Sequence, residues 1–343
     1  MKLLVKKENN YWNDLIILRN LIFKVIREEL NDIGCLEVST PSLCPFPDIA
    51  PMYQYTVTDH QVTSRSIYLK IAPTEYLKRF LIKGIERVFE FSTNFRPENG
   101  DKTHLAEFTS LEVMIKNYTF RDMQNLIERL YRKVLFVFNE FNGRFSNILD
   151  YRKLEIIKQP WQKVSLPDWL ENEYSFSRSE LFKQDAVLKL YNKIMGANYN
   201  GDYIKAIDDI VTYIATTYNC PVFIENYPYY LGGPAKLSNG DNRFKERCEL
   251  FLGPLELANM SSNLVDVVAI KKWYNELTLD EQNEKFRPNT IDTTLMEYFE
   301  IGLPESAVFG LGIERLLMAL LIKDDIKYTR PFSYNELFWE KTR

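Results

Sequence analysis

The stretch RVFEFSTNFRPENGDKTHLAEFTSLEVMI, residues 87–115, decides the fold because it reads as two strands joined by a charged loop. Side chains of a strand alternate between its two faces, so Phe89 and Phe91, and later Leu111 and Val113, belong to an apolar face. The polar face then carries Glu90, Ser92, Asn94 and Arg96 on the first strand, and Phe108, Ser110, Glu112 and Met114 on the second. Arginine and carboxylate groups beside an aromatic ring suggest the floor of a site, although an ordinary solvated sheet face shows the same alternation.

The composition narrows the class of protein. The chain has 343 residues, 45% of them hydrophobic, and 43 Lys plus Arg against 47 Asp plus Glu, for a net charge of −4. This excludes a disordered chain and argues against nucleic-acid binding through a generally basic surface. No run approaches the roughly 20 apolar residues of a membrane span. The N-terminus MKLLVKKENNYW lacks the apolar segment of a signal peptide, so we expect a cytoplasmic protein without a membrane partner.

Cysteine and histidine are too sparse for a zinc enzyme. The four cysteines are scattered without CxxC spacing, and the two histidines are His60 and His104. Any metal is therefore expected to be a hard cation on carboxylates.

The remaining elements predict an α+β fold rather than a regular alternation of strands and helices. A helix over 15–31 precedes an extended segment from Leu36 to Thr40, which ends at Pro41. The other expected elements are a strand at 66–72, helices at 74–83 and 119–138, strands at 221–228 and in RCELFL and LELAN, a helical stretch at 267–300, and a closing strand and helix in AVFGLGIERLLMALLI. Thr119 and Asp122 form a variant of the capping box. We expect a single domain over 1–343, with an insertion at about 139–218.

A second group of charged residues lies in ERCELFLGPLELANM, residues 246–260. Arg247, Glu249 and Phe251 share one face of a strand, and a turn at Gly253 would bring Glu256 close to Phe251. Two neighbouring carboxylates repel unless a cation lies between them, and Mg²⁺ bridging nucleotide phosphates is a common solution. Surface carboxylates at a hairpin are the alternative.

A third group is GLGIERLL, residues 310–317, where glycines allow a strand to approach a ligand and Arg315 begins a helix. A tight packing turn would explain the glycines equally well. The chain has neither a GxxxxGK[ST] loop nor a GxGxxG fingerprint, so a nucleotide site would be built on an antiparallel sheet with arginines.

Together these segments resemble the catalytic domain of class II aminoacyl-tRNA synthetases, in the branch of lysyl-tRNA synthetase and the short elongation factor P–lysine ligase. The helix and strand ending at Pro41 resemble motif 1, FRPENGDKTHLAEFTSLE resembles motif 2, and GLGIERL resembles motif 3. KIAPTEYLKRFLIKGIERVFEF and ELANMSSNLVD follow the lysyl pattern, and the resemblance covers roughly residues 13–335. It implies an antiparallel sheet flanked by helices, a homodimer, and a reaction in which ATP and an amino acid form an aminoacyl adenylate for transfer to an acceptor.

The resemblance also implies roles for individual residues. Arg96 and Arg315 would be catalytic, binding the α- and γ-phosphates of ATP, while Glu98 and Phe108 would contact the adenine and His104 the outer phosphates. Glu249 and Glu256 would hold Mg²⁺. Glu112 and Asn259, in segments that follow the lysyl pattern, would bind the amino acid together with Thr74, Met114 and Asn263.

Two departures from the family bear on the substrate and the acceptor. Motif 1 begins almost at once, without a preceding anticodon-binding domain, so we expect a protein or small-molecule acceptor rather than tRNA. Thr74, Met114 and Asn263 stand where lysyl enzymes have glutamate, tyrosine and glutamate, with Glu75 adjacent to compensate for Thr74. A lysine or β-lysine-like substrate, a shorter diamine, or a neutral amino acid would fit such a pocket. The alternative functions are a minimal synthetase that charges tRNA and a catalytically inactive binding subunit.

Overall fold

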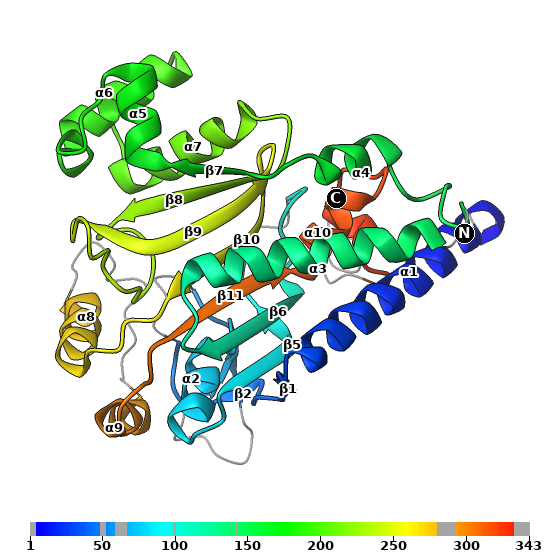
Figure 1. The fold of residues 1–343 in the computed structure, drawn as a ribbon, viewed down its shortest axis with the longest axis horizontal. Helices are drawn as coiled ribbons and strands as arrows, with labels where there is room; N and C mark the ends of the chain where they lie inside the picture. Colours follow the sequence, from blue (N-terminus) through cyan, green and yellow to red (C-terminus); the bar gives the residue numbers. More distant parts are fainter. Residues whose placement is uncertain are drawn as a thin grey trace.

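An eight-stranded, largely antiparallel sheet organises the molecule in this computed structural model, which describes residues 5–48, 53–58, 67–98, 101–140, 143–279 and 292–332 (Figure 1). In spatial order the strands are β1 (Leu36–Glu37), β5 (Arg87–Phe95), β6 (Glu107–Lys116), β11 (Ser306–Gly312), β10 (Leu255–Ser262), β9 (Phe244–Leu252), β8 (Val222–Pro228) and β7 (Gln162–Ser165). Only the two outermost pairs, β1 with β5 and β7 with β8, are parallel. The α+β fold expected from the sequence is confirmed.

Helices cover both faces of this sheet. One face packs against α1 (Val5–Asp32), α3 (Phe120–Glu140), α4 (Tyr151–Lys158) and α10 (Ile313–Leu320). The opposite face is flanked by α2 (Thr74–Ile82), α8 (Val267–Leu279) and α9 (Thr293–Ile301) on the β5–β6 side, and by α7 (Tyr203–Thr216) over β8 and β9. The remaining elements are α5 (Leu166–Tyr174), η1 (Glu180–Phe182), α6 (Gln184–Met195), η3 (Ile326–Thr329) and a small sheet of β2 (Leu43–Cys44), β4 (Ile67–Leu69) and β3 (Thr56–Val57).

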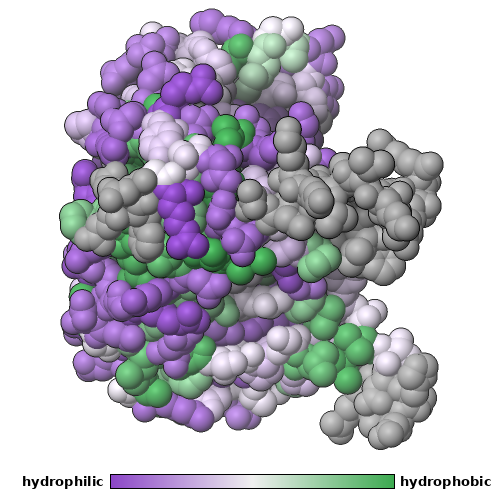
Figure 2. All heavy atoms as spheres, turned by 90° about the vertical axis from the view of Figure 1, so that its right-hand side faces the viewer, coloured by the Kyte–Doolittle hydropathy of each residue, from purple (hydrophilic) through white to green (hydrophobic). Residues whose placement is uncertain are grey.

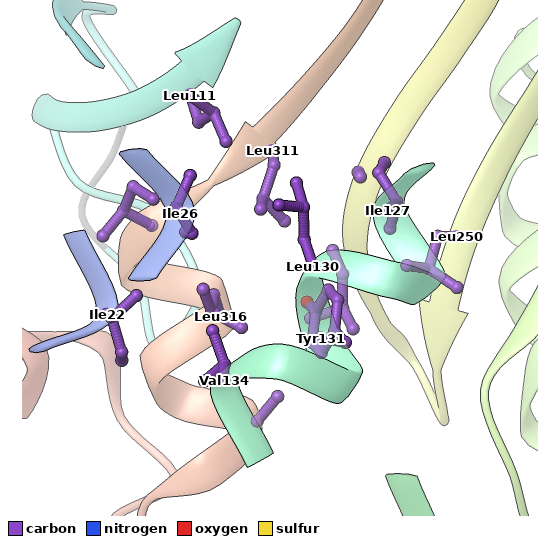
Figure 3. Close-up of a cluster of buried hydrophobic side chains, with 14 of the residues drawn as sticks. Ile22, Ile26, Leu111, Ile127, Leu130, Tyr131, Val134, Leu250, Leu311 and Leu316 are labelled. Atoms are coloured by element: carbon purple, nitrogen blue, oxygen red, sulfur yellow. The ribbon is translucent and has the colours of Figure 1, made fainter. Parts of the chain in front are cut away.

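The main hydrophobic core lies between the sheet and the pair of helices α1 and α3. Buried residues recur every three or four positions along α3, the spacing that keeps side chains on one face of a helix. Figure 3 shows these side chains meeting others from five elements: Ile22 and Ile26 of α1, Leu111 of β6, Leu250 of β9, Leu311 of β11 and Leu316 of α10 surround Ile127, Leu130, Tyr131 and Val134. The apolar face of the sheet is therefore sealed, and only the opposite face is available for a site.

The alternation predicted for residues 87–115 is confirmed in the strand pairing. Glu90 lies opposite Glu112, and Ser92 lies opposite Ser110, so the two polar faces form one surface. The start of α3 is also as expected: the Asp122 carboxylate accepts hydrogen bonds from the backbone and hydroxyl of Thr119 at 2.8 and 2.7 Å.

Several predicted boundaries are wrong. The first helix begins at Val5 rather than near residue 15, and the expected strand from Leu36 to Thr40 is only β1. Beyond β1 the chain stays tied to β5, since the Thr40 hydroxyl donates to Glu90 at 3.2 Å and accepts from Lys70 at 2.8 Å. The segment 139–218 adds β7 to the edge of the main sheet and builds a second core with α5, α6 and α7.

Within the described ranges, no helix combines the length and apolar character of a membrane span. On the face drawn in Figure 2, hydrophobic residues occur in small groups among hydrophilic ones.

We predict that Leu130→Ala lowers the free energy of unfolding by about 2–5 kcal/mol, because it leaves a cavity in the core. Phe136→Ala on the same helix is the matched control: Leu130 is 1% exposed and Phe136 is 62% exposed. The control should change the free energy by less than about 0.5 kcal/mol. Urea unfolding followed by circular dichroism measures both, and equal losses would contradict the core assignment.

Candidate active site

A cavity of about 1080 Å³ lies on the polar face of the sheet and brings together most of the residues singled out in the sequence. Its lining includes Thr74, Arg96, His104, Glu112, Glu249, Glu256, Asn259, Asn263 and Arg315. An adjoining hollow of about 210 Å³ adds Glu98 and Phe108 and shares Arg96, Glu112 and Arg315 with the larger cavity. Segments more than 200 residues apart in the chain thus contribute to one continuous site.

Glu112 forms the floor of this cavity and is held by a short chain of hydrogen bonds. The Asn94 amide donates to Ser110 at 2.7 Å, and the Ser110 hydroxyl donates to Glu112 at 3.1 Å. Burial raises the pKa of Glu112 to about 7, against the opposing effects of Ser110 and the Arg96 guanidinium. A buried carboxylate of this kind favours a cationic ligand.

Gly310 leaves the room that Glu112 needs. The two residues lie opposite each other on neighbouring strands, and a Cβ added to Gly310 would fall 2.6 Å from Glu112 Oε1. The glycine therefore serves a close contact within the protein, and the approach to a ligand predicted from the GLGIERLL segment stays a prediction.

Arg96 reaches the cavity from the end of the first predicted strand. Its guanidinium lies over the Phe108 ring, 5.0 Å from the centroid, and one nitrogen donates to the Ile71 carbonyl at 3.5 Å. Its buried Nε has no hydrogen-bond partner within the described part of the chain. A buried donor without a partner is costly, so the position suits a ligand oxygen.

Arg315 faces the same space from the first turn of α10. It donates to the Glu256 carbonyl at 3.0 Å and to the Glu256 carboxylate at 3.2 Å, and its Nη2 lies 2.9 Å from His104 Nε2. The other side of His104 contacts Asp101 at 2.9 Å. The second histidine, His60, lies outside the described residues.

Glu314, which the sequence reasoning missed, holds Arg315 in place. It is buried and accepts the Thr109 backbone N–H at 2.8 Å and the Arg19 guanidinium at 3.1 Å. These bonds tie α10 to β6 and α1. The sequence does indicate this role. Glu314 and Arg315 are adjacent on a helix, so their side chains point in different directions and both cannot face the same cavity.

Glu249 and Glu256 lie on neighbouring strands as predicted, with Glu256 opposite Phe251. Each carboxylate already has an arginine: Arg247 pairs with Glu249, and Arg315 pairs with Glu256. The Tyr227 hydroxyl also donates to Glu249 at 2.7 Å. Burial raises the pKa of Glu249 to about 7, while Arg247 opposes this and Glu256 adds to it.

These two carboxylates fit a hard divalent cation. No cluster of three or more metal-binding side chains occurs in the described ranges. Mg²⁺ bound to nucleotides is commonly held by one or two carboxylates and completed by phosphate oxygens and water, so two protein ligands suffice.

The amino-acid end of the cavity differs from the expectation. Met114 is 0% exposed and packs in the hydrophobic cluster between α2, α8 and α9, so it does not line the cavity. Asn263 does line it, and its amide donates to Ser306 at 3.0 Å. Glu75 is occupied, accepting from Lys78 at 2.8 Å and from the Tyr274 hydroxyl at 3.1 Å. Glu75 is therefore not a free replacement for a glutamate at Thr74.

The segment 139–218 contributes a wall that the sequence reasoning also missed. Asp208 and Thr212, one turn apart on α7, line the cavity. The Asp208 side chain is exposed to the open cavity, but protein encloses its other sides. This partial desolvation raises its pKa to about 6, against the effect of Arg247. The polar positions of the amphipathic stretch IKAIDDIVTYI were a usable signal.

A largely antiparallel sheet with arginines and paired carboxylates on one face, and without a glycine-rich phosphate loop, defines the class II synthetase type of catalytic domain. The family model for tRNA synthetases class II (D, K and N) matches residues 2–336, so the chain belongs to this family.

Similar proteins include lysine–tRNA ligases from archaea and bacteria. The chain is 30% identical to lysine–tRNA ligase 2 of Methanosarcina mazei over 319 residues, covering 92% of this chain and 61% of the relative. It is 30% identical to the lysine–tRNA ligase of Thermosipho africanus, with 92% and 63% covered. It is 28% identical to that of Porphyromonas gingivalis, with 93% and 54% covered. The chain thus spans between half and two thirds of the length of these relatives.

We predict that Gly310→Ala displaces Glu112 and lowers the free energy of unfolding by about 1–3 kcal/mol, because the added Cβ overpacks this contact. Gly312→Ala is the matched control two residues along, because its added Cβ would lie 3.6 Å from the nearest atom of Arg315, an ordinary contact distance. It should change the free energy of unfolding by less than about 0.5 kcal/mol. Urea unfolding followed by circular dichroism measures both, and equal losses would exclude a special role for Gly310.

Proposed function

We propose that this protein activates an amino acid with ATP as an aminoacyl adenylate and transfers the aminoacyl group to an acceptor. The observation that carries the proposal is the convergence of Arg96, Arg315, Glu249 and Glu256 on one cavity. Attack of a carboxylate on a phosphate brings two anions together, and arginines and a divalent cation are the groups that make this approach favourable.

Different residues would bind the adenine, the phosphates and the Mg²⁺ of the nucleotide. Phe108 and Glu98 line the smaller hollow and would stack on the adenine ring and bind its amino group. Arg96, with its unpartnered buried Nε, would bind the phosphate under attack, while Arg315 and His104 would bind the outer phosphates. Glu249 and Glu256 would hold Mg²⁺, which supplies charge neutralisation. The arginine partners of these carboxylates would then turn to the phosphates.

Glu112 is the group best placed to bind the substrate ammonium. It is a buried carboxylate on the cavity floor, close enough to Arg96 for the guanidinium to influence its pKa. We infer that the substrate is lysine, a β-lysine-like amino acid, or a related amino acid, bound with Thr74, Asn259 and Asn263 at its other contacts. No general base is needed for activation because the attacking carboxylate is already ionised.

We predict that Arg96→Ala and Arg315→Ala each reduce exchange by at least about a thousandfold, because each removes a phosphate-binding charge. The assay is ATP–pyrophosphate exchange without RNA, run with L-lysine, β-lysine, L-ornithine and neutral amino acids. Arg132→Ala is the control, since Arg132 pairs with Glu128 on the surface of α3.

The unsubstituted protein should support exchange with at least one amino acid in this panel. Exchange that survives in both site variants would refute the assignment of the site. Exchange with none of the amino acids, despite ATP binding, would refute amino-acid activation as proposed.

We propose a protein or small molecule as the acceptor, supported by the slightly acidic balance of the chain, which disfavours RNA binding through a basic surface. The second candidate is tRNA, favoured by the names of the similar proteins. With the radiolabelled amino acid that supports exchange, we predict ribonuclease-resistant label after incubation with a cell extract. Label that is lost with ribonuclease would instead establish tRNA charging.

A further inference from the structure

Behind one wall of the cavity, a buried lysine binds three consecutive backbone carbonyls. Lys245 on β9 is 5% exposed, and its Nζ donates to the carbonyls of Leu231, Gly232 and Gly233 at 3.2, 3.2 and 2.9 Å. An ammonium has three N–H groups, so each has a carbonyl partner. Lys245 has no role in the ATP and amino-acid binding proposed above.

Leu231, Gly232 and Gly233 form a turn. Because Lys245 binds the carbonyls of this turn, its position determines the direction of the turn's N–H groups. In a trans peptide the N–H is directed away from the C=O of the same peptide group. The N–H groups of Gly232 and Gly233 belong to the peptides whose carbonyls bind Lys245, so they point away from it. Gly232 and Gly233 line the cavity and Lys245 does not, so these N–H groups are directed toward the cavity. Neither N–H has a hydrogen-bond partner within the described ranges.

Glycine at 232 is required by the same arrangement. Its φ of +76° lies in the left-handed region, and an added Cβ would fall 2.3 Å from Arg247 Nη1. The turn therefore rests directly against the guanidinium that pairs with Glu249. The positive charge of Lys245 on the carbonyls also polarises the peptides, which strengthens their N–H groups as donors.

The turn begins against Arg247, and the segment that follows it reaches the amino-acid end of the cavity. Ala235 pairs with Asn263 in an isolated bridge, and the Leu264 N–H donates to the Pro234 carbonyl at 3.1 Å. These bonds join the segment after the turn to the residues that follow β10.

We propose that Lys245 is a positioning residue that holds the N–H groups of Gly232 and Gly233 as a two-donor site for an oxygen of the amino-acid substrate. The proposal rests on the proposed function. The oxygen belongs either to the substrate carboxylate or to its side chain, and the chemistry of recognition is the same for both.

Kinetics of exchange in Lys245→Met test the role of the ammonium. We expect KM for the amino acid to rise about tenfold while KM for ATP changes by less than about twofold. Lys245→Arg, which keeps a positive charge, should recover part of this loss. Lys236→Met is the matched control, because Lys236 lies in the same segment but pairs with Glu305 on the surface at 3.0 Å. Thermal unfolding confirms that each variant is folded.

Amide hydrogen exchange distinguishes binding from a merely structural role. In the unsubstituted protein, the Gly232 and Gly233 amides should exchange rapidly without ligand and slowly with the amino acid that gives the fastest pyrophosphate exchange. Lys245→Met should abolish this protection. Amides already protected in the free protein, or unchanged by the amino acid, would overturn the proposal, as would an unchanged KM.

The choice of amino acid separates the two sources of the oxygen. A KM increase in Lys245→Met for both L-lysine and L-glutamine indicates the carboxylate, whereas an increase for L-glutamine alone indicates a side-chain oxygen. If no amino acid supports exchange in the unsubstituted protein, the proposed function fails and this inference fails with it. Exchange without the KM effect refutes this inference alone.

Discussion

The pairing of β6 with β11 is the constraint on which the site depends. It places Gly310 opposite Glu112, and the missing side chain of the glycine leaves room for the carboxylate. Because β11 also pairs with β10, the same strand fixes the position of Glu256 relative to both. Helix α10 follows β11 directly, so the strand also sets the position of Arg315 in the cavity. Any change in this register would separate all of these groups at once.

Electrostatic compensation explains how the protein folds around so many charges. The buried Lys70 and Glu90 neutralise each other at 2.8 Å, with Thr40 as a further partner of both. At the proposed nucleotide end, Arg315 and Glu256 are each other's partners. When ATP and a cation bind, Arg315 would exchange Glu256 for a phosphate, and Glu256 would exchange Arg315 for the cation. Binding would then not require unpaired charges to be removed from water. Glu112 is different: within the described ranges no cation forms an ion pair with it, and burial raises its pKa to about 7.

The period-two pattern of residues 87–115 was sufficient to predict the antiparallel pair and its polar face, because that signal depends only on local backbone geometry. The strand-to-helix transition at Gly312 was predictable for the same reason. The burial of Met114 was not, because it depends on α8 and α9 packing across the end of the sheet. Likewise, Glu75 was a plausible free carboxylate until Lys78 and Tyr274 were found beside it. Partners from distant segments decide whether a charged residue is available, and a single sequence does not display them.

The sequence therefore predicts the groups at one end of the cavity better than those at the other. The proposed nucleotide end is built from side chains on strands, on the loop between β5 and β6 and on one helix, and short sequence segments carry them. The proposed amino-acid end depends on backbone groups in the turn at Gly232 and Gly233 and on Lys245 behind it. Backbone donors have no residue signature, and their direction is set by whatever binds the other side of the peptide. This is the physical reason why the class of reaction is easier to infer from this sequence than the amino acid it acts on.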